Sequence, residues 1–243
     1  MDNAMMIGLS RQMTLRRAMD VTANNIANAS TTGFKAERLL LQANPATPAR
    51  ALDGPQRLNY VDEIGIGRDF SQGLLEPTGR PLDLAIEGEG FFVLDTEAGE
   101  RFTRDGRFMM DPEGAITASD GSRVLDTVGQ PIILDPQAGA IEVSASGEIA
   151  QNGAVVAQLG VVRFDAMSAL QKTGDNRFAA GGAEPEPIFT PVVRQGFSEG
   201  SNVRAILEIT RMLEVSRAYS SATRLVNNTD ELSKKALERL GRP

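Results

Sequence analysis

The stretch ANNIANASTTGFKA, residues 23–36, decides how the first part of the chain folds. It places Asn24, Asn25 and Asn28 where an apolar helix that starts near the N-terminus should be ending. Asparagine lowers helix propensity because its side chain competes with the backbone for hydrogen bonds. Three asparagines followed by a Gly-Phe pair therefore need an explanation beyond helix formation.

The asparagines allow two interpretations. In the first, the helix frays, and Asn28 stands at its C-cap before a turn. In the second, the amides are buried between packed helices and fix their register, as a single buried polar residue does in coiled coils. Asn24 and Asn28 lie four residues apart on one helix face, which suits this role. Gly33 would then permit a left-handed backbone angle, and Phe34 would anchor the chain on a neighbour.

Both ends of the chain have apolar side chains at helical spacing, and the centre does not. In the N-terminal segment the main row is Met5, Leu15, Met19, Thr22 and Ile26, with Gly8 and Gln12 as weak members and Met6, Leu9 and Met13 beside it. The C-terminal row is Met212, Val215, Tyr219, Ala222, Val226, Thr229, Ser233, Ala236 and Leu240. That spacing predicts a helix of roughly 38 residues after Ser201 or Asn202, and so long a half-apolar helix must lie against another.

Between the helices the period changes to two. Turn signals recur at Asp105-Gly106, Glu113-Gly114, Asp120-Gly121, Gly129, Ser146-Gly147 and Asn152-Gly153, with short apolar runs between them. Evenly spaced strands and turns predict hairpins. The prolines at 45, 48, 55 and 77 predict an extended connector ahead of this module.

The sequence therefore predicts an α+β fold. Long N- and C-terminal helices pair as a coiled-coil-like unit that hides both apolar rows, and an all-β module rich in hairpins is inserted between them. The expected boundaries are an N-terminal helix over 1–36, a connector over 37–79, the β module over 80–197 and a C-terminal helix over 198–243.

The composition excludes several kinds of chemistry. The chain has no Cys and no His, so the usual zinc sites, disulfides and His-dependent nucleophiles are absent. No catalytic, cofactor-binding or metal-binding residue is predicted. The ends are basic, whereas the centre is acidic and the net charge is −7, which makes nucleic acid a poor partner. We expect neither a small-molecule substrate nor membrane insertion, and the first residues do not match a cleaved signal peptide.

Three motifs in order resemble the bacterial flagellar rod and hook axial proteins. They are ANNIANASTTGFK near the N-terminus, PLDLAIEGEGFFVL (81–94) with FTRDGRFMMDPEGAI (102–116), and GFSEGSNVRAILEITRMLEVSRAYSSATRLV (196–226). Arg80 and Pro81 in GRPLDLAI make the chain more similar to the proximal-rod type than to the distal-rod type, and its length suits a rod protein.

The resemblance implies a structural subunit and no enzyme. It further implies export by the flagellar type III apparatus without a cleaved signal, and stacking with other proximal- and distal-rod subunits into the basal-body rod that crosses the periplasm and transmits torque. Burial of the two helical rows would drive assembly. The candidate assembly residues are Asn24, Asn25, Ile26, Asn28, Gly33, Phe34, Met212, Val215, Tyr219, Ala222 and Val226.

Three alternatives stay open at this point. The chain could be another axial member, of the distal-rod or hook type. It could be a secreted β-domain protein that binds carbohydrate or hydrolyses with carboxylates, although the β segment has no cluster of carboxylates and aromatic residues. It could also be a coiled-coil adaptor that forms a closed oligomer, which light scattering of the purified protein would reveal.

Overall fold

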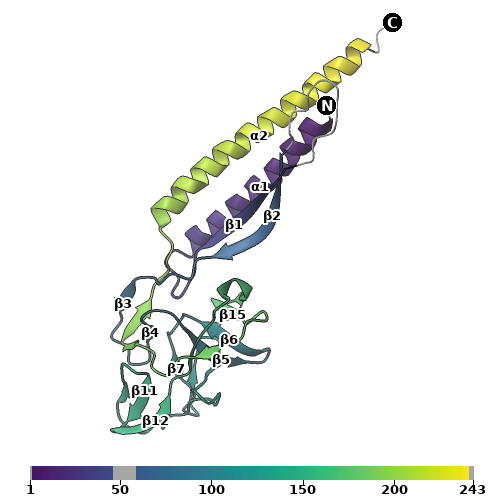
Figure 1. Ribbon diagram of the computed structural model, residues 1–243. Coiled ribbons are helices and arrows are strands. Elements are labelled where there is room, and N and C mark those ends of the chain that lie inside the picture. Colours follow the sequence, from purple (N-terminus) through teal and green to yellow (C-terminus); the bar gives the residue numbers. More distant parts are fainter. Residues whose placement is uncertain (1, 46–58, 241–243) are drawn as a thin grey trace. The chain divides into compact units, whose positions relative to one another are not determined.

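Two helices flank a β-rich middle in the computed structural model, which describes residues 2–45 and 59–240 (Figure 1). The predicted α+β class is confirmed. The elements are α1 (Asp2–Ala27), β1 (Glu37–Pro45), β2 (Asn59–Arg68), β3 (Leu75–Pro77), β4 (Leu84–Ile86), β5 (Phe91–Thr96), β6 (Gly99–Thr103), β7 (Met109–Met110), β8 (Ile116–Thr117), β9 (Arg123–Val124), β10 (Ile141–Val143), β11 (Glu148–Gln151), β12 (Ala154–Gln158), β13 (Val161–Arg163), a 3-10 turn η1 (Met167–Ala169), β14 (Gln171–Gly174), β15 (Arg177–Ala179), β16 (Glu186–Pro187), β17 (Val193–Gln195), β18 (Phe197–Glu199) and α2 (Ala205–Leu240).

The chain forms two compact units, and each is discontinuous in sequence. The helical unit consists of Met1–Ala27, Glu37–Asp69 and Arg204–Pro243, and the β unit consists of Asn28–Ala36 and Phe70–Val203. Residues 28–36, expected with the N-terminal helix, thus belong to the β unit. Residues 37–69, expected as part of the connector, belong to the helical unit.

In the helical unit, α1 and α2 lie side by side (Figure 1). They approach closely at Gly8, where a Cβ atom would lie 2.6 Å from Cγ2 of Val226. One turn further on, Nε2 of Gln12 donates a hydrogen bond of 2.9 Å to Oγ1 of Thr223. The weak members of the predicted N-terminal row are therefore contact positions, because a small residue lets the helices come close and an amide can bond across them.

Residues 37–68 correct the prediction of an extended connector, because they contain an antiparallel hairpin. β1 pairs with β2 from Glu37↔Arg68 to Pro45↔Asn59, with a bulge between Leu40 and Leu41. The sequence hid this strand because its three leucines are consecutive, so the bulged strand lacks the alternation on which the prediction depended. Pro48 and Pro55, which suggested the connector, lie outside the described residues.

The β unit is built on both faces of β5. Its alternating side chains divide between two apolar clusters, with Phe92 and Leu94 in the larger and Phe91 and Val93 in the smaller. Antiparallel partners flank β5 within a sheet of order β14-β15-β6-β5-β9-β8-β7, and β13 also pairs with β5. Smaller sheets of order β10-β11-β12, β17-β4 and β18-β3 complete the described part of the unit.

Turn chemistry in the β unit follows the sequence closely. Asn152 and Gly153 have φ angles of 53° and 78°, and they join β11 to β12 as a two-residue hairpin loop. An Asn-Gly pair favours this geometry because both positions need a positive φ. The predicted hairpin at this position is confirmed.

The close helix contact at Gly8 generates a prediction. Gly8→Leu should destabilise the protein by about 1–3 kcal/mol, because the new side chain must displace the stiff, branched Val226. Urea unfolding followed by the helical circular dichroism signal measures this change.

The double variant Gly8→Leu/Val226→Ala supplies the control. Removal of the opposing methyl groups should recover most of the lost stability, because leucine also has the higher helix propensity. Equal losses in both backgrounds would contradict the contact at Gly8.

Candidate functional site

The helical unit carries large apolar side chains that the chain itself leaves exposed. Met13 on α1 is 67% exposed and Ile206 on α2 is 80% exposed. The exposed set is Met5, Met6, Leu9 and Met13 on α1, Leu40, Leu41 and Ile66 on the hairpin, and Ile206, Leu207, Ile209, Leu213, Leu225 and Leu232 on α2. Single exposed apolar residues are ordinary in soluble proteins, but a set spread along every element of one unit is typical of an interaction surface.

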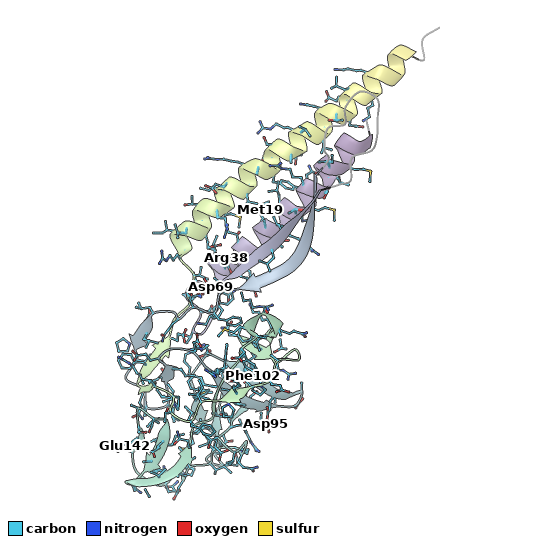
Figure 2. The ribbon with its side chains drawn as sticks, in the orientation of Figure 1. Met19, Arg38, Asp69, Asp95, Phe102 and Glu142 are labelled. Carbon is cyan, nitrogen blue, oxygen red and sulfur yellow. The ribbon has the colours of Figure 1, made fainter. Side chains whose placement is uncertain are left out.

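The exposed residues of α2 lie on different faces from the predicted row. Ile206, Ile209 and Leu213 follow steps of three and four, and Leu225 and Leu232 are seven residues apart. Figure 2 shows side chains on more than one side of α2. We call the exposed set, on α1, the hairpin and α2, the apolar surface.

The predicted row on α2 is less exposed than the residues of α2 that belong to the apolar surface. Ala222 is buried and Val226 faces Gly8, while Met212, Val215 and Tyr219 are half-buried. In this chain the row contributes to the contact between the two helices.

Asn25 is the asparagine with the most buried side chain, at 1% exposure. Its Nδ2 donates to the backbone oxygen of Glu37 (2.8 Å) and to Oε2 of Glu208 (3.2 Å). Its Oδ1 accepts from the backbone N–H of Glu37 at 2.9 Å. One amide thereby connects the last turn of α1, the first residue of β1 and the first turn of α2, all within the helical unit.

The neighbouring predicted residues lie in other environments. Asn24 is exposed and Ile26 is half-buried on α1. Asn28 lies in the turn after α1, where its backbone oxygen accepts from the N–H of Thr31 at 3.1 Å. Asn28 therefore lies beyond the end of α1, whereas Asn25 is the buried amide of the cluster.

Gly33 and Phe34 are buried inside the β unit. Gly33 has a φ of 69°, and its N–H donates to the backbone oxygen of Glu199 at 2.7 Å. Phe34 is 1% exposed, and Nζ of Lys172 lies 4.5 Å from its ring centroid. The neighbour on which Phe34 is anchored here is therefore the β unit of its own chain.

Sequence reasoning missed the partners of these residues. The side-chain amide of Asn25 is hydrogen-bonded to Glu37 and Glu208, and the N–H of Gly33 donates to the backbone oxygen of Glu199. The sequence analysis identified none of these three glutamates as a candidate. A usable signal existed for Glu199, because a buried strand that ends in a carboxylate requires a cation. The Lys35 of the GFK sequence is that cation, at 2.6 Å.

A cleft of about 810 Å³ in the β unit is open and polar. Its charged lining residues are Asp95, Glu97, Asp120 and Asp175 with Arg101, Arg123 and Arg177, and no aromatic residue lines it. Asp120 is committed to an ion pair with Arg177 at 2.7 Å. Among the described residues no three Asp or Glu side chains are grouped to hold a metal ion, and no helix has the length and apolar character to cross a bilayer.

Three family models match the chain in order. The flagella basal body rod protein model covers residues 5–35, the flagellar hook protein FlgE/F/G D1 domain covers 85–151, and the flagellar basal body rod FlgEFG protein C-terminal model covers 194–239. These are the regions that carry the three sequence motifs.

Similar proteins span almost the whole chain. The flagellar basal-body rod protein FlgF of Caulobacter vibrioides is 46% identical over 243 residues, which is 100% of this chain and 99% of the relative. FlgF of Rhizobium meliloti is 36% identical over 99% of both chains, and the rod protein FlgG of Bacillus subtilis is 29% identical over 93% and 94% of the two. The chain therefore belongs to the family of bacterial flagellar basal-body rod proteins, as a structural subunit of the rod and not an enzyme.

Proposed function

We propose that the chain is a proximal-rod subunit that packs against other rod subunits through its terminal helices, and that the resulting axle transmits motor torque. The apolar surface of the helical unit carries this proposal, because those side chains lack cover within the described chain. The β unit buries two apolar clusters of its own, although it also exposes single apolar side chains such as Val128 and Phe189. We place association on the helical unit, because its exposed apolar side chains occur on both of its helices and on both strands of its hairpin.

The terminal helices pair in a coiled-coil-like manner in this proposal. The row from Met212 to Val226 has the 3-4 spacing of a coiled-coil seam, and the contacts at Gly8 and Thr223 support a close seam. The seam holds each helical unit together, and the apolar surface outside it meets neighbouring copies and related subunits. Head-to-tail contacts of this kind do not close into a ring, so they extend into a filament.

The partners follow from the shared ends of the family. The N-terminal and C-terminal family models cover the segments that form α1 and α2, and relatives named FlgF and FlgG match across the same segments. We infer that proximal- and distal-rod subunits pack on one another by the same kind of surface. The chain would reach the rod in the periplasm through the flagellar type III export apparatus, without cleavage of its N-terminus.

Register within the helical unit depends on Asn25 in this proposal. Its amide satisfies both backbone hydrogen-bonding groups of Glu37 and also donates to Glu208. An apolar contact can slide by a residue at low cost, whereas a buried amide with three partners cannot. Asn25 thus fixes where α1, β1 and α2 start relative to one another, and hence the shape of the apolar surface.

Leu213→Glu tests the apolar surface. Leu213 is exposed on α2, so the monomer should keep its stability within about 0.5 kcal/mol. The rod should fail to assemble, because each subunit loses a contribution of about 1.5–3 kcal/mol and must also bury a charge. Basal bodies isolated from the variant strain should lack the rod, and the cells should not swim.

Val128→Glu is the matched control for Leu213→Glu. Val128 is an exposed apolar residue of the β unit and lies outside the apolar surface. We expect it to leave swimming intact. Normal swimming of the Leu213→Glu strain would overturn the role of the apolar surface.

Asn25→Asp tests the register. The substitution removes both donor bonds and places a carboxylate beside the carboxylate of Glu208, so stability should fall by about 2–4 kcal/mol in urea unfolding. Asn24→Asp, one residue earlier and exposed, should change stability by no more than about 0.5 kcal/mol. Addition of Glu208→Gln to Asn25→Asp should restore part of the loss, and a failure to do so contradicts the assigned contact.

Mass spectrometry of purified basal bodies tests position and export together. We expect this chain between the motor end of the rod and the FlgG-type subunits, with an N-terminal peptide that retains Asp2. A peptide that begins downstream of α1 would refute export without cleavage. A discrete dimer or trimer of the purified chain, with no ability to join basal bodies, would favour a closed adaptor instead.

A further inference from the structure

The β unit buries a carboxylate between two cations. Nζ of Lys35 lies 2.6 Å from Oε1 of Glu199, and Nη1 of Arg104 lies 3.1 Å from its Oε2. The exposed fractions of the three side chains are 1%, 3% and 0% for Lys35, Arg104 and Glu199. We call these three residues the clasp.

The Glu199 carboxylate accepts hydrogen bonds from its partners among the described residues. Besides the two cations, the backbone N–H of Gly73 donates to Oε1 at 2.9 Å. Arg104 in turn donates from Nη2 to the backbone oxygen of Gly88 at 2.6 Å, and its guanidinium lies 5.5 Å from the ring of Phe91. Burial lowers the pKa of Arg104, while the charge of Glu199 opposes that shift.

Such a cluster is costly to build for stability alone. Two buried cations share one buried carboxylate, and replacement of buried ion pairs by apolar residues is often neutral or stabilising. A cluster of this kind is better explained by the specific arrangement it enforces. The question is which parts of the chain it arranges.

The clasp joins three segments that lead directly into the helical unit along the sequence. Residues 33–36 precede β1, residues 71–75 follow β2, and residues 199–202 precede α2. We call these segments the three links. All three links belong to the β unit.

Backbone contacts bind the three links to one another. The N–H of Gly33 donates to the oxygen of Glu199 (2.7 Å), and the N–H of Gly200 donates to the oxygen of Leu74 (2.8 Å). The side chain of Asn202 accepts from the N–H of Ala36 at 2.8 Å. A Cβ atom on Gly73 would lie 2.0 Å from the oxygen of Gly200, so only glycine fits where these two links cross.

We propose that Glu199 is a positioning residue that locks the three links together, so that none of them moves without the other two. The ion pair of Lys35 connects the first link to Glu199, and the hydrogen bond from the N–H of Gly73 connects the second link to the same carboxylate. Glu199 itself belongs to the third, and Arg104 fixes the whole to the body of the β unit.

A mechanical consequence follows, and it rests on the proposed function as a torque-transmitting subunit. The three links are among the covalent connections through which a twist applied to the helical unit reaches the β unit. Three links locked to each other share that load, whereas three independent links would each yield in turn.

Hydrogen exchange of the purified full-length protein, read by mass spectrometry, tests the lock. Lys35→Met substitutes a residue of the first link, removes the bonds of its Nζ to Glu199 and to the backbone oxygen of Ser71, and leaves one cation for the one carboxylate. We expect amide exchange to rise at least about tenfold in all three links, including 71–75 and 199–202, which contain no substitution. A rise confined to 33–36 would overturn the proposal.

Glu199→Gln is the second variant, and it perturbs the centre. The amide NH₂ group must face a donor, because Lys35, Gly73 and Arg104 all donate to the carboxylate. Exchange in the three links should rise together by about 100-fold or more, as expected when one side of a buried pair is removed. Unchanged exchange in any link overturns the assignment of Glu199 as the positioning residue.

Ile149→Ala provides the matched control for a general loss of stability. Ile149 is fully buried in the larger cluster and is not part of the clasp or of the links. Its exchange should rise across the strands of that cluster rather than selectively in the links.

A cell experiment separates the lock from its mechanical consequence. In media of increasing viscosity, Lys35→Met cells should lose a larger share of their swimming speed than Ile149→Ala cells. Equal losses overturn the mechanical consequence while leaving the exchange result standing. Absence of the chain from basal bodies would instead count against the proposed function.

Discussion

The main constraint on this structure is that neither unit is continuous in sequence. The chain passes between them after Ala27, Ala36, Asp69 and Val203. A unit assembled from separated segments must hold the ends of those segments, because each connection is otherwise a free hinge. Two buried polar groups near the crossings meet this need: the amide of Asn25 in the helical unit and the carboxylate of Glu199 in the β unit.

The two units differ in how they use their apolar side chains: the β unit buries most of its aromatic side chains in its own core, and the helical unit leaves apolar side chains available for association. The β unit closes around aromatic side chains such as Phe102, which lies among its strands, and ion pairs cover part of its surface (Figure 2). The helical unit instead uses a glycine and a glutamine at its internal contact and leaves methionines and leucines outside. A helical pair that is stable alone would bury its methionines and leucines between the helices and expose its polar residues. The opposite distribution found here accords with membership in a family of rod subunits.

How much the sequence predicts depends on whether a feature is local. The two helices and the Asn-Gly hairpin were predictable because spacing and turn chemistry are encoded in neighbouring residues. The β1–β2 hairpin was not, since its bulge interrupts the alternation of Leu39, Leu40 and Leu41. Gly8 and Gln12 were ranked as weak because hydrophobicity does not measure how closely two helices approach.

Candidate site residues show the same limit. The asparagine cluster was identifiable as unusual, but the choice of Asn25 over Asn24 and Asn28 depends on Glu37 and Glu208, which are far away in sequence or give no local signal. The motif also spans two units, because its asparagines up to Ala27 belong to one and its Gly-Phe-Lys end to the other. Periodicity cannot reveal such a division, since the division depends on which distant segments of the chain each half of the motif packs against.

The central strand β5 has a consequence for how the β unit loses its structure. Because Phe92 and Leu94 fill one cluster while Phe91 and Val93 fill the other, neither cluster can melt while β5 stays in place. The two clusters therefore behave as one cooperative folding block, and partly molten forms of this region should be scarce at equilibrium. The β unit is then either folded or fully unfolded, so its apolar strands are exposed to solvent only during brief, complete unfolding events.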